Sequence, residues 1–138
     1  MPIQAAYLKI TRRQAVVKLT GTGQYTIDLA NLVHTSASTG LVPTTQTFTR
    51  ANCICTISDI AYDVSAVQSN VTRGSNIIWA MTPGPGAFNF TQNIGVALDQ
   101  DANANVIINI AGSSDGAVIL QFSKGLGFND VNLQNVGR

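Results

Sequence analysis

The chain contains no glutamate, and lysine occurs only at positions 9, 18 and 124. Glutamate and lysine are among the residues that favour solvent-exposed helices, so the sequence has little material for them. Instead there are 14 threonines, 12 valines and 13 isoleucines, whose β-branched side chains fit a pleated surface. With 12 glycines and 12 asparagines for turns, the composition predicts an all-β protein.

A chain of 138 residues can bury a core without disulfide bonds, so we expect residues 1–138 to form a single β domain. Turn signals recur every ~8 to 12 residues, which predicts about eight short antiparallel strands. We find no internal repeat. The expected architecture is a β-sandwich or a jelly-roll-like fold.

Two hairpins are expected near the ends of the chain. Segments 15–19 and 24–29 flank a glycine-containing turn, and segments 105–111 and 117–123 flank another. In the second pair, apolar residues alternate with polar or outward-facing ones. The six residues predicted to form the core are Val106, Ile108, Ile110, Val118, Leu120 and Phe122.

The middle of the chain predicts one further hairpin and two interruptions. Segments 71–73 and 76–81 enclose Gly74-Ser75, which suits a two-residue turn with glycine first. Residues 31–45 show no periodicity and predict a long loop or crossover. Residues 82–86 (TPGPG) are expected to form a corner.

Charge and hydropathy exclude several partners. The formal charge of +1 provides no basic patch for nucleic acid, and the longest apolar run, residues 77–81, is far shorter than the ~20 residues that span a bilayer. The first residues do not resemble a secretory signal. We therefore expect no nucleic-acid or membrane partner, and synthesis and folding in a cytosol.

No residue pattern indicates catalysis. The single histidine, His34, lies in a polar segment without a recognisable nucleophile and carboxylate, and is expected at the surface. We therefore predict that the protein is not an enzyme and has no catalytic residues.

Asp99, Asp101, Asn103 and Asn105 alternate like the first ligands of an EF-hand calcium loop. However, alanine stands at position 104, where that loop needs glycine, and isoleucine at 110, where it needs glutamate. An Asx-rich turn is the favoured interpretation, with no tight calcium binding.

Other candidates for metal or cofactor binding are equally weak. Cys53 and Cys55 should point the same way from a strand, which suits buried free thiols better than a disulfide or a zinc site. Gly125-Leu126-Gly127-Phe128 lacks the lysine and the helix of a phosphate loop. We predict no metal site and no cofactor.

Trp79, Tyr62 and Phe88 lie among asparagines and aspartates, so they could form a sugar-stacking platform. The alternative, which we favour, is that the tryptophan belongs to the core, where it gains most from burying its ring.

Four segments resemble small virion structural proteins of tailed phages, particularly marine cyanophages: 6–9 (AYLK), 15–23 (AVVKLTGTG), 71–76 (VTRGSN) and 120–125 (LQFSKG). The resemblance spans most of residues 5–128 and consists of strand and turn patterns, so no site residue is carried over. It implies a capsid decoration or cement protein, located in the virion and made in the host cytoplasm. The implied partners are the major capsid protein or other virion proteins, with homo-oligomers or multiple copies on each particle.

A tail- or fibre-associated module that binds a carbohydrate or receptor is the alternative function. Residues 1–5 and 129–138 lie outside the strongest strand patterns and are expected to be arms that either fray or dock on a neighbour.

Overall fold

The computed structural model describes residues 2–36, 44–65, 69–90, 103–112, 114–125 and 127–130. Within these ranges the strands are β1 (Gln4–Ile10), β2 (Gln14–Gly21), β3 (Gly23–Ile27), β4 (Thr35–Ser36), β5 (Thr44–Phe48), β6 (Cys55–Val64), β7 (Asn70–Arg73), β8 (Asn76–Ala80), β9 (Gly84–Asn89), β10 (Val106–Ile110), β11 (Gly116–Lys124) and β12 (Phe128–Asp130). Two short 3₁₀ helices, η1 (Leu29–Leu32) and η2 (Arg50–Asn52), lie between strands.

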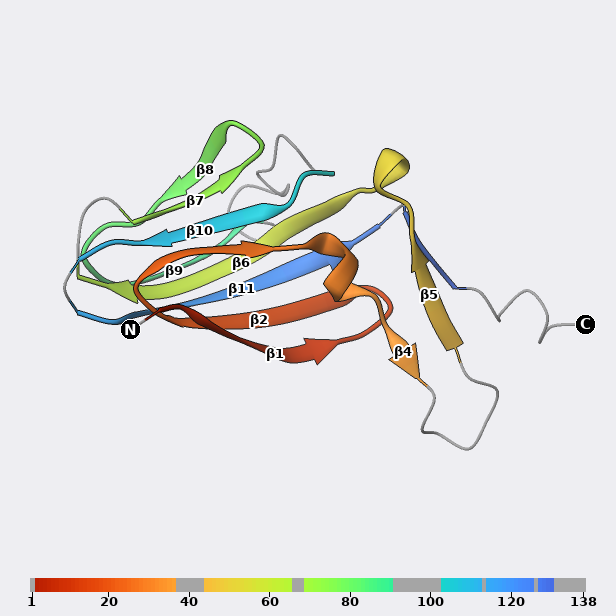
Figure 1. Ribbon diagram of the computed structural model, residues 1–138, viewed down its shortest axis with the longest axis horizontal. Helices are drawn as coiled ribbons and strands as arrows, with labels where there is room; N and C mark the ends of the chain where they lie inside the picture. The colour runs from red at the N-terminus through yellow and green to blue at the C-terminus, as the bar shows by residue number, and fades with distance from the viewer. Residues whose placement is uncertain are drawn as a thin grey trace, which may run out of the picture.

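Nine strands form two antiparallel sheets that pack face to face (Figure 1). The larger sheet has the order β1-β2-β11-β6-β9, and the smaller has the order β3-β10-β7-β8. Their inward side chains meet in one cluster of buried apolar residues to which both sheets contribute. The protein is therefore an all-β sandwich, as the composition predicts.

The path of the chain makes this sandwich a jelly roll. Along the strands β2, β3, β6, β7, β8, β9, β10 and β11, every consecutive pair crosses from one sheet to the other except β7 and β8. The resulting sheet orders, β2-β11-β6-β9 and β3-β10-β7-β8, are those of an eight-stranded double-sheet jelly roll. β1 adds an edge strand to the larger sheet.

Both hairpins expected near the chain ends are wrong for this reason. β2 pairs with β1 and β11, whereas β3 pairs with β10. The turn between β2 and β3 carries the chain between sheets, and Gly21 and Gly23 accommodate it with φ angles of 126° and 116°. Likewise, β10 and β11 belong to different sheets, and Gly112 between them has a φ of 110°.

The predicted core is nevertheless correct. All six core residues expected from the alternation in 105–111 and 117–123 are at most 1% exposed. Side-chain alternation specifies which residues of a strand point inward. It does so equally whether the next strand of the chain lies beside it in the same sheet or opposite it in the other sheet. Here β10 and β11 contribute their apolar side chains from opposite walls of the same interior.

The middle hairpin is confirmed, and the corner is displaced. Arg73 pairs with Asn76 across Gly74-Ser75, and Gly74 has a φ of 59°. The expected corner at 82–86 is only partly right, because β9 already begins at Gly84. Pro85 is tolerated there because β9 is an edge strand, where a missing ladder donor is least costly.

The segment 31–45, expected to be a loop, includes the end of η1, all of β4 and the start of β5, with 37–43 outside the described residues. The expected arms also belong in part to sheets. Residues 4–5 pair with β2, and residues 129–130 pair with β5, whereas 1 and 131–138 lie outside the described residues.

Aromatic side chains close the two long sides of the sandwich. Between β1 and β3, the hydroxyl groups of Tyr7 and Tyr25 lie 3.3 Å apart in a hydrogen bond. On the other side, Trp79 contacts Phe88 and Phe90 with ring centroids 5.3 and 5.4 Å apart. These rings bridge edge strands of opposite sheets, so they stabilise the stacking of the two layers.

Candidate interaction surfaces

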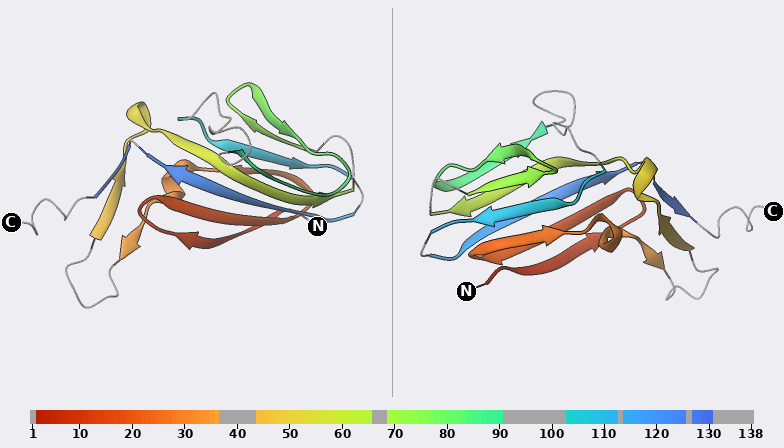
Figure 2. Two further views of the ribbon diagram at one scale, coloured as in Figure 1. Left: turned by 180° about the vertical axis from the view of Figure 1, so that it is seen from behind. Right: turned by 45° about the horizontal axis from the view of Figure 1, so that its top comes forward.

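The left view of Figure 2 looks onto the outer side of the larger sheet, and strand register places Ile119, Ala61 and Ala117 near the centre of this face. Strand register arranges its outward side chains in rows across β2, β11, β6 and β9. The rows are Thr20–Ala117–Asp63–Pro85, Lys18–Ile119–Ala61–Ala87 and Val16–Gln121–Asp59–Asn89. An antiparallel sheet with one solvated face usually carries polar residues there, so this apolar centre is a candidate contact surface.

The same face contains an open hollow of about 360 Å³, lined in part by Val16, Asp59, Ala61 and Ile119. The Oδ1 atom of Asp59 is buried, and no described residue donates a hydrogen bond to it. A buried acceptor without a donor destabilises a protein by about 1–3 kcal/mol. Gln121 and Asn89, the neighbours of Asp59 in its row, also line the hollow, so this covered carboxylate oxygen lies among both polar and apolar side chains.

Charges of opposite sign occupy the two halves of this face. Lys9 and Lys18 lie on β1 and β2, whereas Asp59 and Asp63 lie on β6. β11 separates the two groups, so Lys18 and Asp59 are at least two strand spacings, or about 10 Å, apart. Within the described chain, none of these four groups forms an ion pair.

The outer face of the smaller sheet is different in character. Its rows include Gln24–Asn109–Asn70 and Thr26–Ile107–Thr72–Ile77. The Asn109 amide donates to Asn70 Oδ1 at 2.9 Å, and the Thr72 hydroxyl donates to the Ile107 carbonyl at 3.5 Å. This face is uncharged, and much of its hydrogen-bonding capacity is used internally.

A third sheet, β12-β5-β4, projects from one end of the sandwich (Figure 1). It brings together the segment after η1 and the segment after β11. The rings of Phe48 and Phe128 pack at 5.1 Å between centroids, and the Arg50 guanidinium lies 5.2 Å from the Phe48 ring centroid.

Buried polar contacts fix the base of this projection. The Lys124 ammonium donates to the Leu32 carbonyl at 2.7 Å and to Gln46 Oε1 at 2.9 Å. Gln46 in turn donates to the Arg12 carbonyl at 2.8 Å and accepts from the His34 amide at 3.1 Å. Because Lys124 and Gln46 are 7% and 4% exposed, these bonds are shielded from water and hold β5 firmly against the end of β11.

His34 is not the surface histidine that the sequence suggests. It is half-buried, and its Nδ1 atom is covered without a hydrogen-bond partner in the part of the chain that the structure describes. A catalytic histidine is normally oriented through that nitrogen, commonly by a carboxylate. Its main-chain bonds to Gln46 give it a place in the base of the projection instead.

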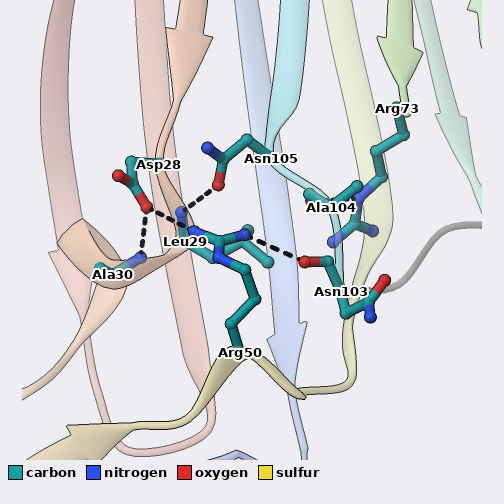
Figure 3. A network of polar contacts seen from close by, with 8 residues as sticks. All are labelled: Asp28, Leu29, Ala30, Arg50, Arg73, Asn103, Ala104 and Asn105. Carbon is teal, nitrogen blue, oxygen red and sulfur yellow. Dashed lines mark hydrogen bonds and ion pairs between the residues drawn. The ribbon is translucent and has the colours of Figure 1, made fainter. Parts of the chain in front are cut away.

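The segment expected to form an Asx-rich turn supplies oxygen atoms to arginines (Figure 3). Residues 99–102 lie outside the described residues. The Asn103 carbonyl accepts from Arg50 at 3.0 Å, and the Ala104 carbonyl accepts from Arg73 Nε at 3.0 Å. Asn105 Oδ1 accepts from the Leu29 amide at 3.2 Å. These three oxygens accept hydrogen bonds from protein donors.

The same network joins the two helical turns. Arg50 also pairs with Asp28 at 3.0 Å, and Asp28 caps η1 by accepting from the Ala30 amide at 3.0 Å. Arg50 and Asp28 are both exposed, so the ion pair itself contributes little free energy. Its role is to set the position of η2 relative to η1.

The cysteines are free and buried, as expected. Burial raises the pKa of the Cys53 thiol above its ordinary value, although the charges of Arg73 and Arg50 oppose that shift. A thiol with a raised pKa is a poor nucleophile at neutral pH. Among the described residues, no group of three or more His, Cys, Asp or Glu side chains is arranged to hold a metal ion.

The glycine-rich segment near the C-terminus is a packing turn. Gly127 has a φ of 90°, and a Cβ atom there would lie 2.6 Å from Cys53 Cα and 2.9 Å from the Thr49 carbonyl oxygen. The Gly125 amide donates to the Ile54 carbonyl at 2.8 Å. These glycines allow close approach of two backbones.

Trp79 and Phe88 are partly buried and pack against the core, which agrees with the favoured interpretation.

Sequence reasoning did not identify the rows of outward side chains on the larger sheet, because alternation predicts which residues face outward without showing which strands are neighbours. No helix in the described part of the chain is long and apolar enough to cross a membrane.

Comparison with protein families, curated proteins and solved structures gave no match for this chain.

Proposed function

We propose that this protein is a non-enzymatic virion structural protein that decorates or stabilises the capsid of a tailed phage. The observation that carries the proposal is the projecting sheet β12-β5-β4, fixed at its base by Lys124 and Gln46. The jelly roll provides a compact body, and the projection extends from it toward a neighbour. The resemblance of four sequence segments to phage virion proteins supports the same function.

The projecting sheet suits attachment for a physical reason. β4 and β12 are its edge strands, with two and three residues. Edge strands present unpaired N–H and C=O groups, which can pair with a strand from another protein. Residues 131–138 follow β12 directly, and Val131, Leu133 and Val136 provide apolar side chains for docking.

Jelly rolls occur in viral capsid proteins and also in lectins, so the fold alone does not choose between capsid decoration and glycan binding. A sugar platform needs accessible aromatic faces. Trp79, Phe88 and Phe90 pack on one another between the sheets, with Phe88 and Phe90 centroids 5.0 Å apart. This arrangement favours decoration over a tail- or fibre-associated receptor-binding module.

The test is attachment to empty heads of the phage that encodes the chain. We expect the full chain to co-sediment with heads in a saturable manner, in symmetry-related copies visible by electron microscopy. Deleting residues 131–138, which leaves β12 intact, should weaken attachment by roughly tenfold, as expected when a small docking segment is lost. The thermal melt of the isolated domain should stay nearly unchanged.

Ile77→Asp provides a matched control, because Ile77 is 64% exposed on β8, which belongs to a different sheet from the projection. This variant should attach to heads like the wild type. Equal attachment by the truncated chain would rule out the C-terminal docking segment. Failure of every form to bind heads, together with retention on a glycan column, would replace decoration with receptor binding.

A further inference from the structure

The outer face of the larger sheet carries features that the proposed attachment through β12-β5-β4 does not use. It has an apolar centre, an unsatisfied buried oxygen on Asp59, and lysines and aspartates segregated to opposite halves. We propose that a second copy of this chain packs on this face, about a two-fold axis near β11, with Lys18 of each copy paired with Asp59 of the other.

Charge complementarity identifies a second copy as the occupant. β11 is the middle strand of the larger sheet. A two-fold axis in the interface close to β11 places the β1–β2 half of one copy over the β6–β9 half of the other. The lysine-bearing half then meets the aspartate-bearing half twice, while Ile119 and Ala117 from both copies meet at the centre.

Asp59 shows why the contact gains from a partner. Its Oδ1 atom lacks a donor among the described residues, and Lys18 of the same copy, two strands away, does not supply one. When the Asp59 carboxylate turns outward, an ammonium from a second copy can donate a charged hydrogen bond to that oxygen within a contact that excludes water. Asp63 lies two rows from Asp59 on β6, and the Lys18 row runs between them, so each carboxylate is one row from the row of the lysine.

The edges of the larger sheet argue for packing through faces. β1 has a register shift between Tyr7 and Lys9, and β9 contains Pro85. A bulge and a proline are both devices that prevent edge-to-edge pairing of sheets. Association of this sheet with another copy is therefore directed to its face.

The area of this face sets the expected strength of dimerisation. Five strands about 4.8 Å apart and three rows about 6.7 Å apart cover on the order of 500 Å² per copy. The pair would bury about 1,000 Å², which is at the low end for specific association. We therefore expect a weak dimer, with a dissociation constant on the order of 10 µM, that would be reinforced wherever copies are held close together.

Sedimentation of the isolated full chain over a range of concentrations tests this inference without any capsid. The wild type should shift from monomer to dimer, and Ile119→Asp should weaken dimerisation at least ~30-fold by placing a charge at the centre. Ala87→Arg, at an exposed position on β9, is a second disruptive variant that leaves the fold intact. Ile77→Asp, on the opposite sheet, should dimerise like the wild type.

A charge swap tests the pairing itself. Lys18→Glu should weaken the dimer roughly tenfold, and Lys18→Glu combined with Asp59→Lys in one chain should restore it to within about threefold. Thermal melts verify that each variant is folded.

Three results would overturn the inference: a wild type that stays monomeric at millimolar concentration, a dimer unaffected by Ile119→Asp and Ala87→Arg, or a charge swap that fails to restore dimerisation. If the chain is monomeric and Ile119→Asp abolishes attachment to heads, the face binds a capsid protein instead. Whether the chain dimerises through this face does not depend on whether residues 131–138 attach it to a capsid.

Discussion

The two outer faces of the sandwich carry different residue classes, with amides and hydroxyls on the smaller sheet and charged and apolar side chains on the larger one. On the smaller sheet, asparagine and threonine side chains bond to one another or to the backbone, as with Asn109 and Asn70. On the larger sheet, the centre is apolar, and the Asp59 oxygen in its hollow is unsatisfied. The unsatisfied oxygen on the larger face supports the proposed contact with a second copy, and nothing comparable on the smaller face calls for a partner among the described residues.

The largest expected effect comes from comparing an inward and an outward side chain on the same strand. Leu120 on β11 is fully buried between the sheets, whereas Ile119 points to the outer face. Leu120→Ala should lower the free energy of unfolding by about 2–5 kcal/mol through lost apolar burial and a cavity. Ile119→Ala should lower it by less than about 1 kcal/mol. Reversible denaturant melts at low protein concentration measure both values, and equal losses would contradict the assigned faces.

Removing a polar side chain should change the stability of the monomer in opposite directions on the two faces, by less than Leu120→Ala does. Asn109→Ala removes the donor to Asn70 and should destabilise the monomer by about 1 kcal/mol. Asp59→Val removes a buried acceptor that lacks a donor, so it should leave monomer stability unchanged or raise it by up to about 1 kcal/mol. Denaturant midpoints under monomeric conditions provide the measurement. A clear loss of stability in Asp59→Val would mean that the carboxylate is already satisfied.

Alkaline pH tests the contact between the sheets, independently of either outer face. Burial, together with the hydrogen bond to Tyr25, raises the pKa of Tyr7 to about 12. The unfolded chain loses the Tyr7 proton near pH 10, so this contribution to stability is complete below pH 10 and is lost as the pH rises toward 12. Tyr7→Phe should therefore flatten the decline of the melting temperature over that range.

Tyr62 serves as the control of opposite sign. Hydrogen bonding by Thr82 lowers the pKa of Tyr62, so its phenolate contributes stability above pH 10. Tyr62→Phe should therefore remove a gain that builds up as the pH rises to 10, and leave the slope between pH 10 and 12 unchanged. If both substitutions change the decline in the same direction, the assigned environment of one of the two tyrosines is incorrect.

The smallest expected effect is that of calcium on the segment 99–105. The described oxygens of Asn103, Ala104 and Asn105 already accept protein hydrogen bonds. A site with a dissociation constant near 10 µM would stabilise the protein by about 2.7 kcal/mol in 1 mM calcium. We expect no shift in the melting temperature on addition of 1 mM calcium chloride. A shift that disappears in Asp101→Ala would establish a site.

Sequence reasoning succeeded where the information is local. The alternation in 106–110 and 118–122 identified the buried side chains, and Gly74-Ser75 identified the β7–β8 turn. It failed where the partner of a strand is distant. Gly21 and Gly112 were interpreted as hairpin turns, although both carry the chain from one sheet to the other. A glycine with positive φ serves either purpose, so the local signal is the same.

The candidate surfaces show the same limit. Val16, Asp59 and Ile119 lie far apart in the sequence and become neighbours only because β2, β11 and β6 are adjacent in the larger sheet. Lys124 and Gln46, each an ordinary polar residue in its own segment, become a buried pair only when β5 reaches the end of β11.

By itself, the amino-acid sequence determined the β class, the inward side chains and one tight turn, because these depend on residue propensity and on the two-residue period of a strand. The tertiary structure decided the jelly-roll order, the projecting sheet and the contrast between the two outer faces. Side-chain alternation determines which face of a strand is buried, but it contains no information on which strand lies alongside. That choice is made by the packing of the whole core, to which both sheets contribute their apolar faces.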